Sequence, residues 1–338
     1  AHAVHALVAE GQVGVWGARR EEEEEEGGAD ERDKEWRVRY AGKTGIELRG
    51  CKEVRETVWG NEASFVPLSK QGLPRGCREM MWLKLSGAED LKGKHPAGYA
   101  RLMLYPPQDQ VHDPGMAKAE FEIDKDVKRT FIDSEIRDTL AAVGRGRDSN
   151  TEWFCPKLKR LLLAYARHNR RVGYCQSLNY LGGIVVIVVE REEECFWLLV
   201  AMLDNLLPKT YYCDLSGVML DVEVLNLLME RSLGPVRDKL EITHLPLTSF
   251  AAQWFMCAFV NVLPGPSVLR VWDCLFVDGH VVLFRVALAL LKAIEGELGL
   301  ATEMEDAMMA LQRAKTLEIQ TVLQIANGCF GEGVVDLS

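Results

Sequence analysis

Apolar residues recur every three or four positions over most of the chain from about residue 55 onward. This spacing places them on one face of an α-helix and predicts a succession of amphipathic helices. Prolines 208, 235, 246, 264 and 266 fall between the apolar segments, where they would end helices. The clearest apolar sets are Leu158, Leu161, Leu162 and Tyr165; Phe196, Leu199, Val200 and Leu203; Val218, Val222, Leu225 and Met229; Phe250, Trp254 and Cys257; and Leu283, Val286, Leu290 and Ile294.

No region shows several successive strands of period two, so we expect an all-α fold of roughly ten or more helices. The run LGGIVVIVV at residues 181–189 is too short to span a bilayer, which takes about 20 residues, and predicts a buried core helix. The aromatic residues at helical spacing, Trp254, Trp272 and Phe276, are expected in the core. We expect two helical lobes that meet near Leu206–Thr210.

The N-terminal part of the chain has a different pattern. Residues 1–35 contain the acidic block EEEEEEGGADE, which repels itself and has little to bury, so we predict that this segment is disordered. Residues 36–65 follow, with Trp36, Val38 and Tyr40 alternating with arginines, and predict a short hairpin or extended lead-in. The net charge of the whole chain is −10, which argues against a nucleic acid as partner.

The cysteines and the absence of targeting signals indicate an intracellular protein. The nine cysteines include no C-x-x-C pair, so a zinc site of the usual spacing is not expected. The sequence has no N-x-S/T sequon and no signal peptide, and it predicts a reducing, cytoplasmic environment. The chain does not begin with Met, so a targeting segment could precede it.

Three local motifs suggest a catalytic or nucleotide-binding site, but each lacks a residue or context that such a site requires. The GKT at residues 42–44 is not a P-loop, because Arg37 stands where the first glycine of that motif is required. Cys175 as a nucleophile would need a base, and none of the available histidines lies in a recognisable local signature; a buried structural thiol is favoured. Ser177 lacks the G-x-S-x-G context of a nucleophilic serine. The available histidines are His168, His244 and His280.

A combination of polar residues is more informative than any of them alone. Tyr174-x-Gln176 has a spacing expected about once per 400 positions by chance, and so says little. Ile123, Asp126 and Arg129 have a spacing expected about once per 8,000 positions. On a helix Asp126 and Arg129 share one face, which by itself predicts only a surface ion pair.

Four motifs follow one another along the chain. They are Gly72-Leu73-Pro74 with Arg78 and Trp82, Ile123-x-x-Asp126-x-x-Arg129-Thr130, Val172-Gly173-Tyr174-x-Gln176, and Arg270-x-Trp272-Asp273. Taken together, they resemble the TBC domain, the family of GTPase-activating proteins for Rab GTPases, and they occur in that family's order. One such motif would be weak support for the resemblance, whereas four in order are specific. The resemblance covers about residues 66–330.

The resemblance implies an irregular all-α fold of many helices in two lobes and a mechanism with two fingers, side chains supplied in trans to the active site of the GTPase. Arg129 would be the arginine finger, and Gln176 the glutamine finger that positions water. The residues expected to shape or orient the site are Arg78, Trp82, Ile123, Asp126, Thr130 and Tyr174. Ser177 departs from the family, which usually has glycine there, and adds a side chain where the GTPase comes close.

The resemblance also implies the partners. A Rab-family GTPase would bring GTP and Mg²⁺, so the chain needs no cofactor of its own and completes the partner's active site rather than acting alone. Contact with a membrane would be indirect, through the lipidated GTPase, with recruitment from the cytoplasm to an endomembrane surface in vesicle trafficking. The alternative is a catalytically silent TBC-fold module that binds a GTPase or effector; the intact fingers argue against it, and Ser177 leaves it open.

Overall fold

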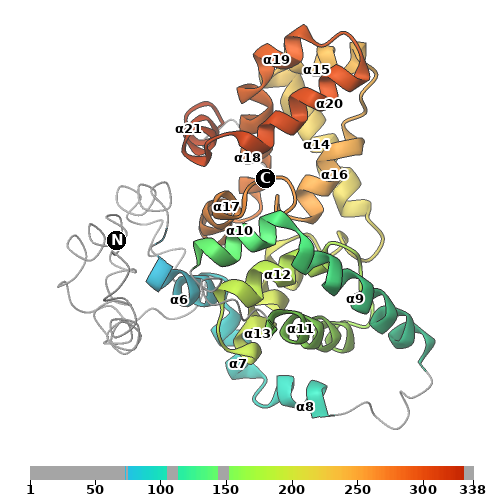
Figure 1. Cartoon of the computed structure of the whole chain (residues 1–338), viewed down its shortest axis with the longest axis vertical. Helices are drawn as coiled ribbons and strands as arrows, with labels where there is room; N and C mark the ends of the chain where they lie inside the picture. The colour runs from blue at the N-terminus through green and yellow to red at the C-terminus, as the bar shows by residue number, and fades with distance from the viewer. Residues whose placement is uncertain (1–72, 74, 105–112, 144–151, 331–338) are drawn as a thin grey trace, which may run out of the picture.

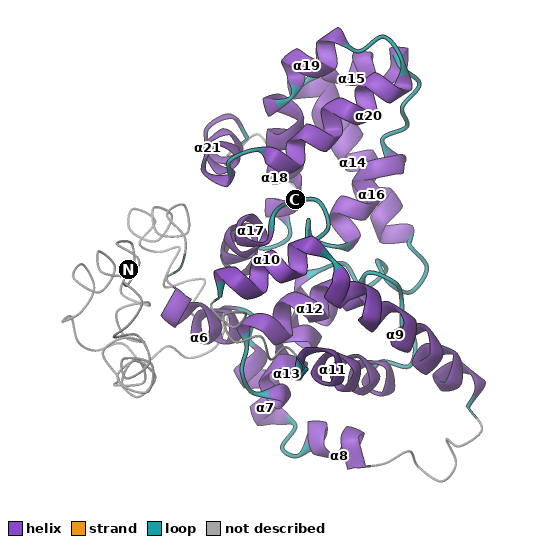
Figure 2. Cartoon of the chain, viewed as in Figure 1, coloured by secondary structure: helices purple, strands orange, loops and turns teal. Residues whose placement is uncertain are grey.

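The structure is a computed structural model of the chain, and it describes residue 73 and residues 75–104, 113–143 and 152–330. Every regular element in this part of the chain is helical, as Figure 2 shows, so the predicted all-α class is confirmed. The predicted acidic segment at residues 1–35 and the lead-in at residues 36–65 lie outside the described residues. Across the described ranges, no helix has the length and apolar character needed to span a membrane.

The helices follow one another through turns and loops. Their bounds are α6 (Arg75–Leu85), α7 (Ala88–Lys94), α8 (Gly98–Leu104), α9 (Pro114–Ile132), α10 (Ser134–Ala142), α11 (Phe154–His168), α12 (Leu178–Val188), α13 (Glu192–Ala201), the π-helix η2 (Met202–Leu206), α14 (Ser216–Ser232), α15 (Gly234–Ile242), α16 (Thr248–Met256), α17 (Gly265–Asp278), α18 (Val281–Ala293), α19 (Glu295–Leu300), α20 (Met304–Arg313), the 3₁₀ helix η3 (Ala314–Thr316) and α21 (Ile319–Cys329).

The apolar sets read from the sequence form the core. All of their members are buried except Phe250, which is partly buried against the same core. Two prolines differ from the expectation that prolines separate the helices: Pro235 and Pro266 lie inside the first turns of α15 and α17. A proline is tolerated there because the first N–H groups of a helix have no partner within the helix.

Helix α12 is the apolar centre of the first group of helices. All its residues but Tyr180 are buried, which confirms the predicted core helix at residues 181–189. Its run of Ile and Val has only a modest intrinsic helix propensity, so burial on all sides decides the conformation. At Gly182 a Cβ atom would lie 2.9 Å from Leu158 Cδ1 of α11, so the glycine permits this close packing.

The helices form two groups that are joined along one side (Figure 1). In the first group α11 packs against α9, α12 and α13, and α12 also contacts α10. In the second group α14 packs against α15, α16 and α18, and α18 against α21. Helix α17 connects the groups, because it contacts α6, α10 and α18. The boundary between lobes near Leu206–Thr210 stays a prediction.

A buried carboxylate joins α6 to α17. Asp273, which is fully buried, accepts hydrogen bonds from the Leu73 N–H at 3.0 Å and from the indole N–H of Trp82 at 3.0 Å. Its two oxygens also accept from Arg78 Nε and Nη2, at 2.9 and 3.0 Å. Arg78 Nη2 further donates to the Leu73 carbonyl at 2.8 Å. A charge buried in this way is tolerated because every oxygen has a donor.

Aromatic packing surrounds this junction. The rings of Trp82 and Phe276 lie 5.1 Å apart and those of Trp82 and Trp272 lie 5.6 Å apart, all three being buried. The expectation that Trp254, Trp272 and Phe276 belong to the core is therefore confirmed. The polar contacts of Trp82 and Arg78 are with α17 and residue 73, so in this structure they hold the two groups of helices together.

Removing the buried carboxylate is expected to destabilise the fold strongly. In Asp273→Ala, the Arg78 guanidinium and the Trp82 N–H remain buried without their acceptor, and we expect the free energy of unfolding to fall by about 3–5 kcal/mol. Urea unfolding measures this change. The control is Glu122→Ala, which removes an exposed pair with Lys125 at 3.5 Å and should cost less than about 1 kcal/mol. Equal losses in the two variants would contradict the prediction.

Candidate functional site

Helix α9 carries Arg129 near its C-terminal end. The helix begins at a defined point, because the Asp113 side chain accepts hydrogen bonds from backbone N–H groups of the first turn and Pro114 occupies the first helical position. Ile123 and Val127 lie on its buried face. The Arg129 side chain points away from that face and is 69% exposed. The arginine is thus presented to solvent from a helix that the core holds in place.

Asp126 restrains the guanidinium group of Arg129. The Asp126 residue is buried, and its Oδ1 lies 3.8 Å from Arg129 Nη1. Its Oδ2 accepts a hydrogen bond from the Tyr174 hydroxyl at 2.8 Å. Burial and then the hydrogen bond to Asp126 raise the pKa of the Tyr174 phenol above its ordinary value, so the phenol is a neutral donor. The carboxylate is therefore held by Arg129 within α9 and by Tyr174, which lies 48 positions after Asp126 in the sequence.

A second set of hydrogen bonds joins α9 to the start of α12. The Thr130 hydroxyl, which is fully buried, donates to the Asp126 carbonyl at 2.7 Å and accepts from Asn179 Nδ2 at 2.7 Å. Asn179 Oδ1 in turn accepts from the Ser177 N–H at 3.1 Å. Asn179 therefore connects the helix of the candidate arginine to the loop of the candidate glutamine.

The loop between α11 and α12 presents Gln176. Its first turn is closed by Asn169, whose carbonyl accepts from the Gly173 N–H at 2.8 Å and whose side chain accepts from the Val172 N–H. Gly173 has φ 59°, a left-handed conformation that glycine adopts without strain. The Gln176 side chain is exposed and directly precedes the restrained Ser177. Arg129 and Gln176 are thus two exposed side chains on segments that share one support.

Ser177 adopts a backbone conformation that favours glycine. Its φ and ψ are 106° and −33°, outside the regions that L-residues ordinarily occupy. Its side chain is buried and lies beside the thiol of Cys257. The side chain that serine adds at this position therefore points into the fold, whereas the sequence led us to expect it on the docking side.

Cys175 has no activating base in the described part of the chain. Its thiol lies 3.3 Å from the Gln176 carbonyl oxygen, and burial raises its pKa, which disfavours the thiolate. His168 and His280 pair with carboxylates elsewhere, and His244 lies on the surface between α15 and α16. The described residues also hold no cluster of three or more metal-ligating side chains.

The structure thus divides the residues expected at the site into two groups. Asp126, Thr130 and Tyr174 join the segments that carry Arg129 and Gln176. Ile123 lies in the core, and Arg78 and Trp82 belong to the α6–α17 junction. Sequence reasoning missed Asn179; the available signal was a polar residue in the first turn of an otherwise apolar helix.

Comparison with known proteins identifies relatives of the chain. A model of the Rab-GTPase-TBC domain family matches residues 75–298. Growth hormone-regulated TBC protein 1-A of Danio rerio is 34% identical over 244 residues, which cover 72% of this chain and 64% of the relative. Growth hormone-regulated TBC protein 1 of Homo sapiens is 34% identical over 223 residues, covering 66% and 61%. The matched part therefore spans less than two thirds of these relatives.

Two solved structures share the fold. The TBC domain of a flagellar RabGAP from Chlamydomonas aligns with a TM-score of 0.66 and 22% identity, over 93% of this chain and 92% of that one. The Ypt/Rab-GAP domain of Gyp1p aligns with a TM-score of 0.55 and 18% identity, over 89% and 97%. At these identities the likeness establishes the arrangement of helices.

Replacing Ser177 by glycine is expected to stabilise the chain. A non-glycine residue in a sparsely populated backbone region costs about 1–3 kcal/mol of strain. This cost exceeds both the free energy of the interaction between the hydroxyl and the Cys257 thiol and the additional backbone entropy that a glycine loses on folding. We expect Ser177→Gly to raise the free energy of unfolding by about 1 kcal/mol, measured in urea. Ser177→Ala keeps the strain, loses the hydroxyl, and should be less stable than the original chain. The reverse order would refute this account.

Asn179 is expected to contribute to stability through both of its hydrogen bonds. Asn179→Ala leaves the Thr130 hydroxyl and the Ser177 N–H without their partner in a buried place, which should lower the free energy of unfolding by about 2–3 kcal/mol. Asn179→Asp keeps an acceptor for the Ser177 N–H but cannot donate to Thr130. Urea titration of both variants tests the assignment, and a neutral Asn179→Ala would show that the link is unimportant.

Proposed function

Because the chain belongs to the Rab-GTPase-TBC domain family, we propose that it is a GTPase-activating protein for a Rab-family small GTPase. The observation that supports this most directly is the pair of exposed side chains, Arg129 and Gln176, on two segments joined by buried hydrogen bonds. The chain completes the active site of its partner and is not a stand-alone enzyme. GTP and Mg²⁺ come with the GTPase.

The proposed role of Arg129 is to stabilise charge in the transition state. GTP hydrolysis builds charge on the phosphoryl oxygens, and a planar guanidinium, always protonated, donates to them without a proton transfer. Such a finger raises the rate about 10³–10⁵-fold, which is a barrier reduction of about 4–7 kcal/mol. Asp126 serves as a positioning residue, because it limits the rotamers of Arg129 before docking and so reduces the entropy lost on insertion.

The proposed role of Gln176 is to orient the attacking water. A neutral amide accepts a hydrogen bond from the water through its oxygen and donates to phosphate through its nitrogen. Neither Gln176 nor Arg129 acts as a general base, so no titrating histidine is needed. The loop is held by Asn179 at its C-terminal end, and its backbone conformation at Gly173 and Ser177 directs Gln176 outward.

The partner also accounts for contact with membranes. A Rab carries its own lipid anchor, so the chain reaches an endomembrane surface from the cytoplasm by binding the GTPase. A binding module without catalytic action would require a finger to be blocked. Since both finger side chains are exposed and the Ser177 side chain points inward, the geometry favours the active form.

Single-turnover GTP hydrolysis by a panel of Rab proteins tests this proposal. With a Rab that the chain stimulates, Arg129→Ala and Gln176→Ala should each lower the stimulated rate more than tenfold, because each removes a contact made in the transition state. Arg129→Lys should also fail to restore the rate, because an ammonium lacks the planar fork.

The matched control is Arg313→Ala, which removes an exposed arginine of α20 that pairs with Glu297, and its rate should be unchanged. Unchanged rates in the Arg129 and Gln176 variants would contradict the two-finger mechanism. Binding to Rab proteins without stimulation of any of them would establish the silent binding module instead.

A further inference from the structure

Helix α14 presents an apolar face to solvent. Met219, Leu220 and Leu227 are 51%, 65% and 50% exposed, and Leu215, which directly precedes the helix, is 45% exposed. At about 100° per residue, Leu220 and Leu227 lie within about 100° of Met219 around the helix axis. We refer to these four residues as the α14 face. Large apolar side chains gathered on one face are typical of a surface that a partner covers.

This face is separate from the side of α14 that packs in the core. The opposite side carries the buried residues Val218, Val222, Leu225 and Met229, and α14 contacts α15, α16 and α18. Those contacts leave the α14 face uncovered by the described part of the chain, since its residues remain about half exposed. The helix is therefore apolar on two sides, of which the fold uses only one.

The start of α14 is held rigidly. The hydroxyl of Tyr211 donates to Asp221, and His280 Nε2 lies 2.8 Å from both Asp221 Oδ2 and the Tyr211 oxygen. At Gly217 a Cβ atom would lie 2.3 Å from Thr210 Oγ1, so glycine allows the first helical turn to pack directly on the preceding turn. A rigid element loses little conformational entropy when a partner docks on it.

The segment that leads into α14 is joined to the loop of Gln176. The Asn169 side chain, which closes the first turn of that loop, donates to Asp204 Oδ1 of η2 at 3.2 Å. Residues 207–215 then connect η2 to α14. The chain leading into α14 is therefore held against the start of the loop between α11 and α12.

A second connection passes through α16. The Ser177 side chain lies beside Cys257, which directly follows α16, and the Tyr212 hydroxyl donates to the Met256 carbonyl at the end of that helix, at 2.8 Å. Helix α14 packs along α16. The position of the α14 face relative to Gln176 is thus fixed by contacts on both sides of the loop.

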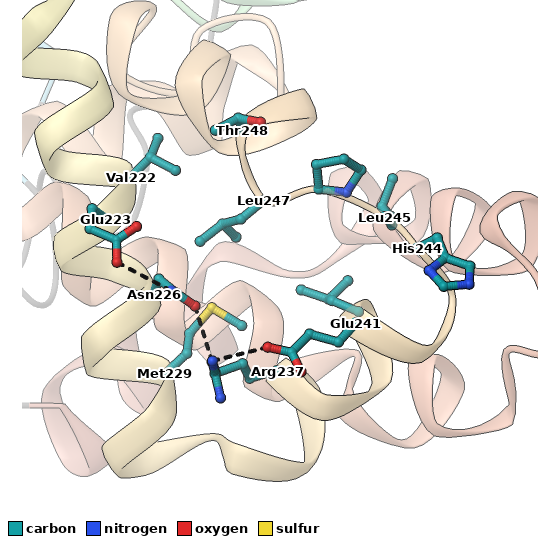
Figure 3. A pocket seen from close by; sticks show the side chains of 12 residues that line it. Val222, Glu223, Asn226, Met229, Arg237, Glu241, His244, Leu245, Leu247 and Thr248 are labelled. Carbon is teal, nitrogen blue, oxygen red and sulfur yellow. Dashed lines mark hydrogen bonds and ion pairs between the residues drawn. The ribbon is translucent and has the colours of Figure 1, made fainter.

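A pocket adjoins the α14 face. It lies between α14, α15 and α16 and has a volume of about 420 Å³ (Figure 3). Glu223 lines its edge and lies between Met219 and Leu227 around the α14 axis, so the pocket and the face form one surface. The apolar lining consists of Val222, Met229, Leu240, Leu245, Pro246 and Leu247.

The charges at the pocket indicate what it accepts. Arg237 is engaged within the fold, because it pairs with Glu241 at 2.9 Å and donates to Asn226 at 3.1 Å. Glu223 is exposed, and the hydrogen bond drawn to it in Figure 3 is a long one of 3.5 Å from Asn226. A cationic side chain of a partner would find in Glu223 a carboxylate with little competing interaction, beside an apolar pocket for its aliphatic part.

We infer that the α14 face and the adjoining pocket form a second docking surface for the GTPase whose nucleotide site Arg129 and Gln176 reach. This inference rests on the function proposed above. The matching surface of the GTPase is apolar and carries a basic side chain that pairs with Glu223. The nine residues from Met219 to Leu227 extend about 12 Å along the helix axis. A globular partner of about 150 residues measures nearly 40 Å across, so it is wide enough to cover this surface and to extend well beyond it.

Single-turnover hydrolysis at increasing concentrations of the full chain tests the inference, with a GTP-loaded Rab that the chain stimulates. In Met219→Ser combined with Leu220→Ser, we expect the half-saturating concentration to rise tenfold or more while the maximal rate stays within twofold. Both side chains are exposed, so thermal unfolding should be unchanged. Glu223→Lys should also raise the half-saturating concentration, and more strongly at low salt, because it repels the basic side chain of the partner.

The control is Met308→Ser combined with Met309→Ser, which alters a comparably exposed apolar patch on α20 and should change neither quantity. A half-saturating concentration that the α14 and Glu223 variants leave unchanged would overturn the inference, although the proposed function would stand. A lower maximal rate at an unchanged half-saturating concentration would overturn it as well. If the original chain stimulates no Rab in the panel, the proposed function fails, and the inference fails with it.

Discussion

The hydroxyl of Thr130 is the point at which the two halves of the candidate site meet. It donates to the Asp126 carbonyl within α9 and accepts from Asn179 at the start of α12. Because it is fully buried, neither bond competes with water, and loss of either partner leaves a polar group without compensation. The helix of Arg129 and the loop of Gln176 therefore keep one relative position, which a reaction that needs both side chains at one phosphate requires.

That link depends on how closely α12 approaches its neighbours. At Gly183 a Cβ atom would lie 3.2 Å from the Thr130 side chain and 3.1 Å from Ile136, so the glycine lets α12 lie against α9 and α10. The rest of α12 is apolar on nearly all sides, so burial in the core holds the helix in place. The support of the site is thus part of the hydrophobic core, and only the side chains of the proposed fingers, Arg129 and Gln176, leave it.

Sequence periodicity predicted the helices well because burial of an apolar stripe is a local property of spacing. It identified the core side of α14 through Val218 and Val222, and it identified α12 in spite of its β-branched residues. Pairings across long stretches of sequence could not be predicted this way. Arg78 was expected to shape or orient the site. Its partner Asp273 is 195 positions away, and no local pattern indicates which of the acidic residues it meets.

The same limit applies to Asn179 and to the α14 face. Asn179 carries no chemical signature, and its role follows from a contact 49 positions back in the chain. Met219, Leu220 and Leu227 are apolar residues in a helix with a known apolar side, so their exposure becomes evident only when the neighbouring helices are placed. The resemblance to the TBC family supplied the identity of Arg129 and Gln176, whereas their shared support had to be seen in the structure.

The division between fingers and docking surface follows from the energetics of association. Arg129 and Gln176 are polar and flexible, so their insertion costs side-chain entropy and desolvation that their hydrogen bonds in the ground state offset only in part. Interactions that strengthen in the transition state raise the rate but not the affinity. Affinity then has to come from apolar area that is rigid and already exposed, at about 25 cal/mol per Å² buried. The α14 face supplies such area next to the loop of Gln176, so one partner can meet both.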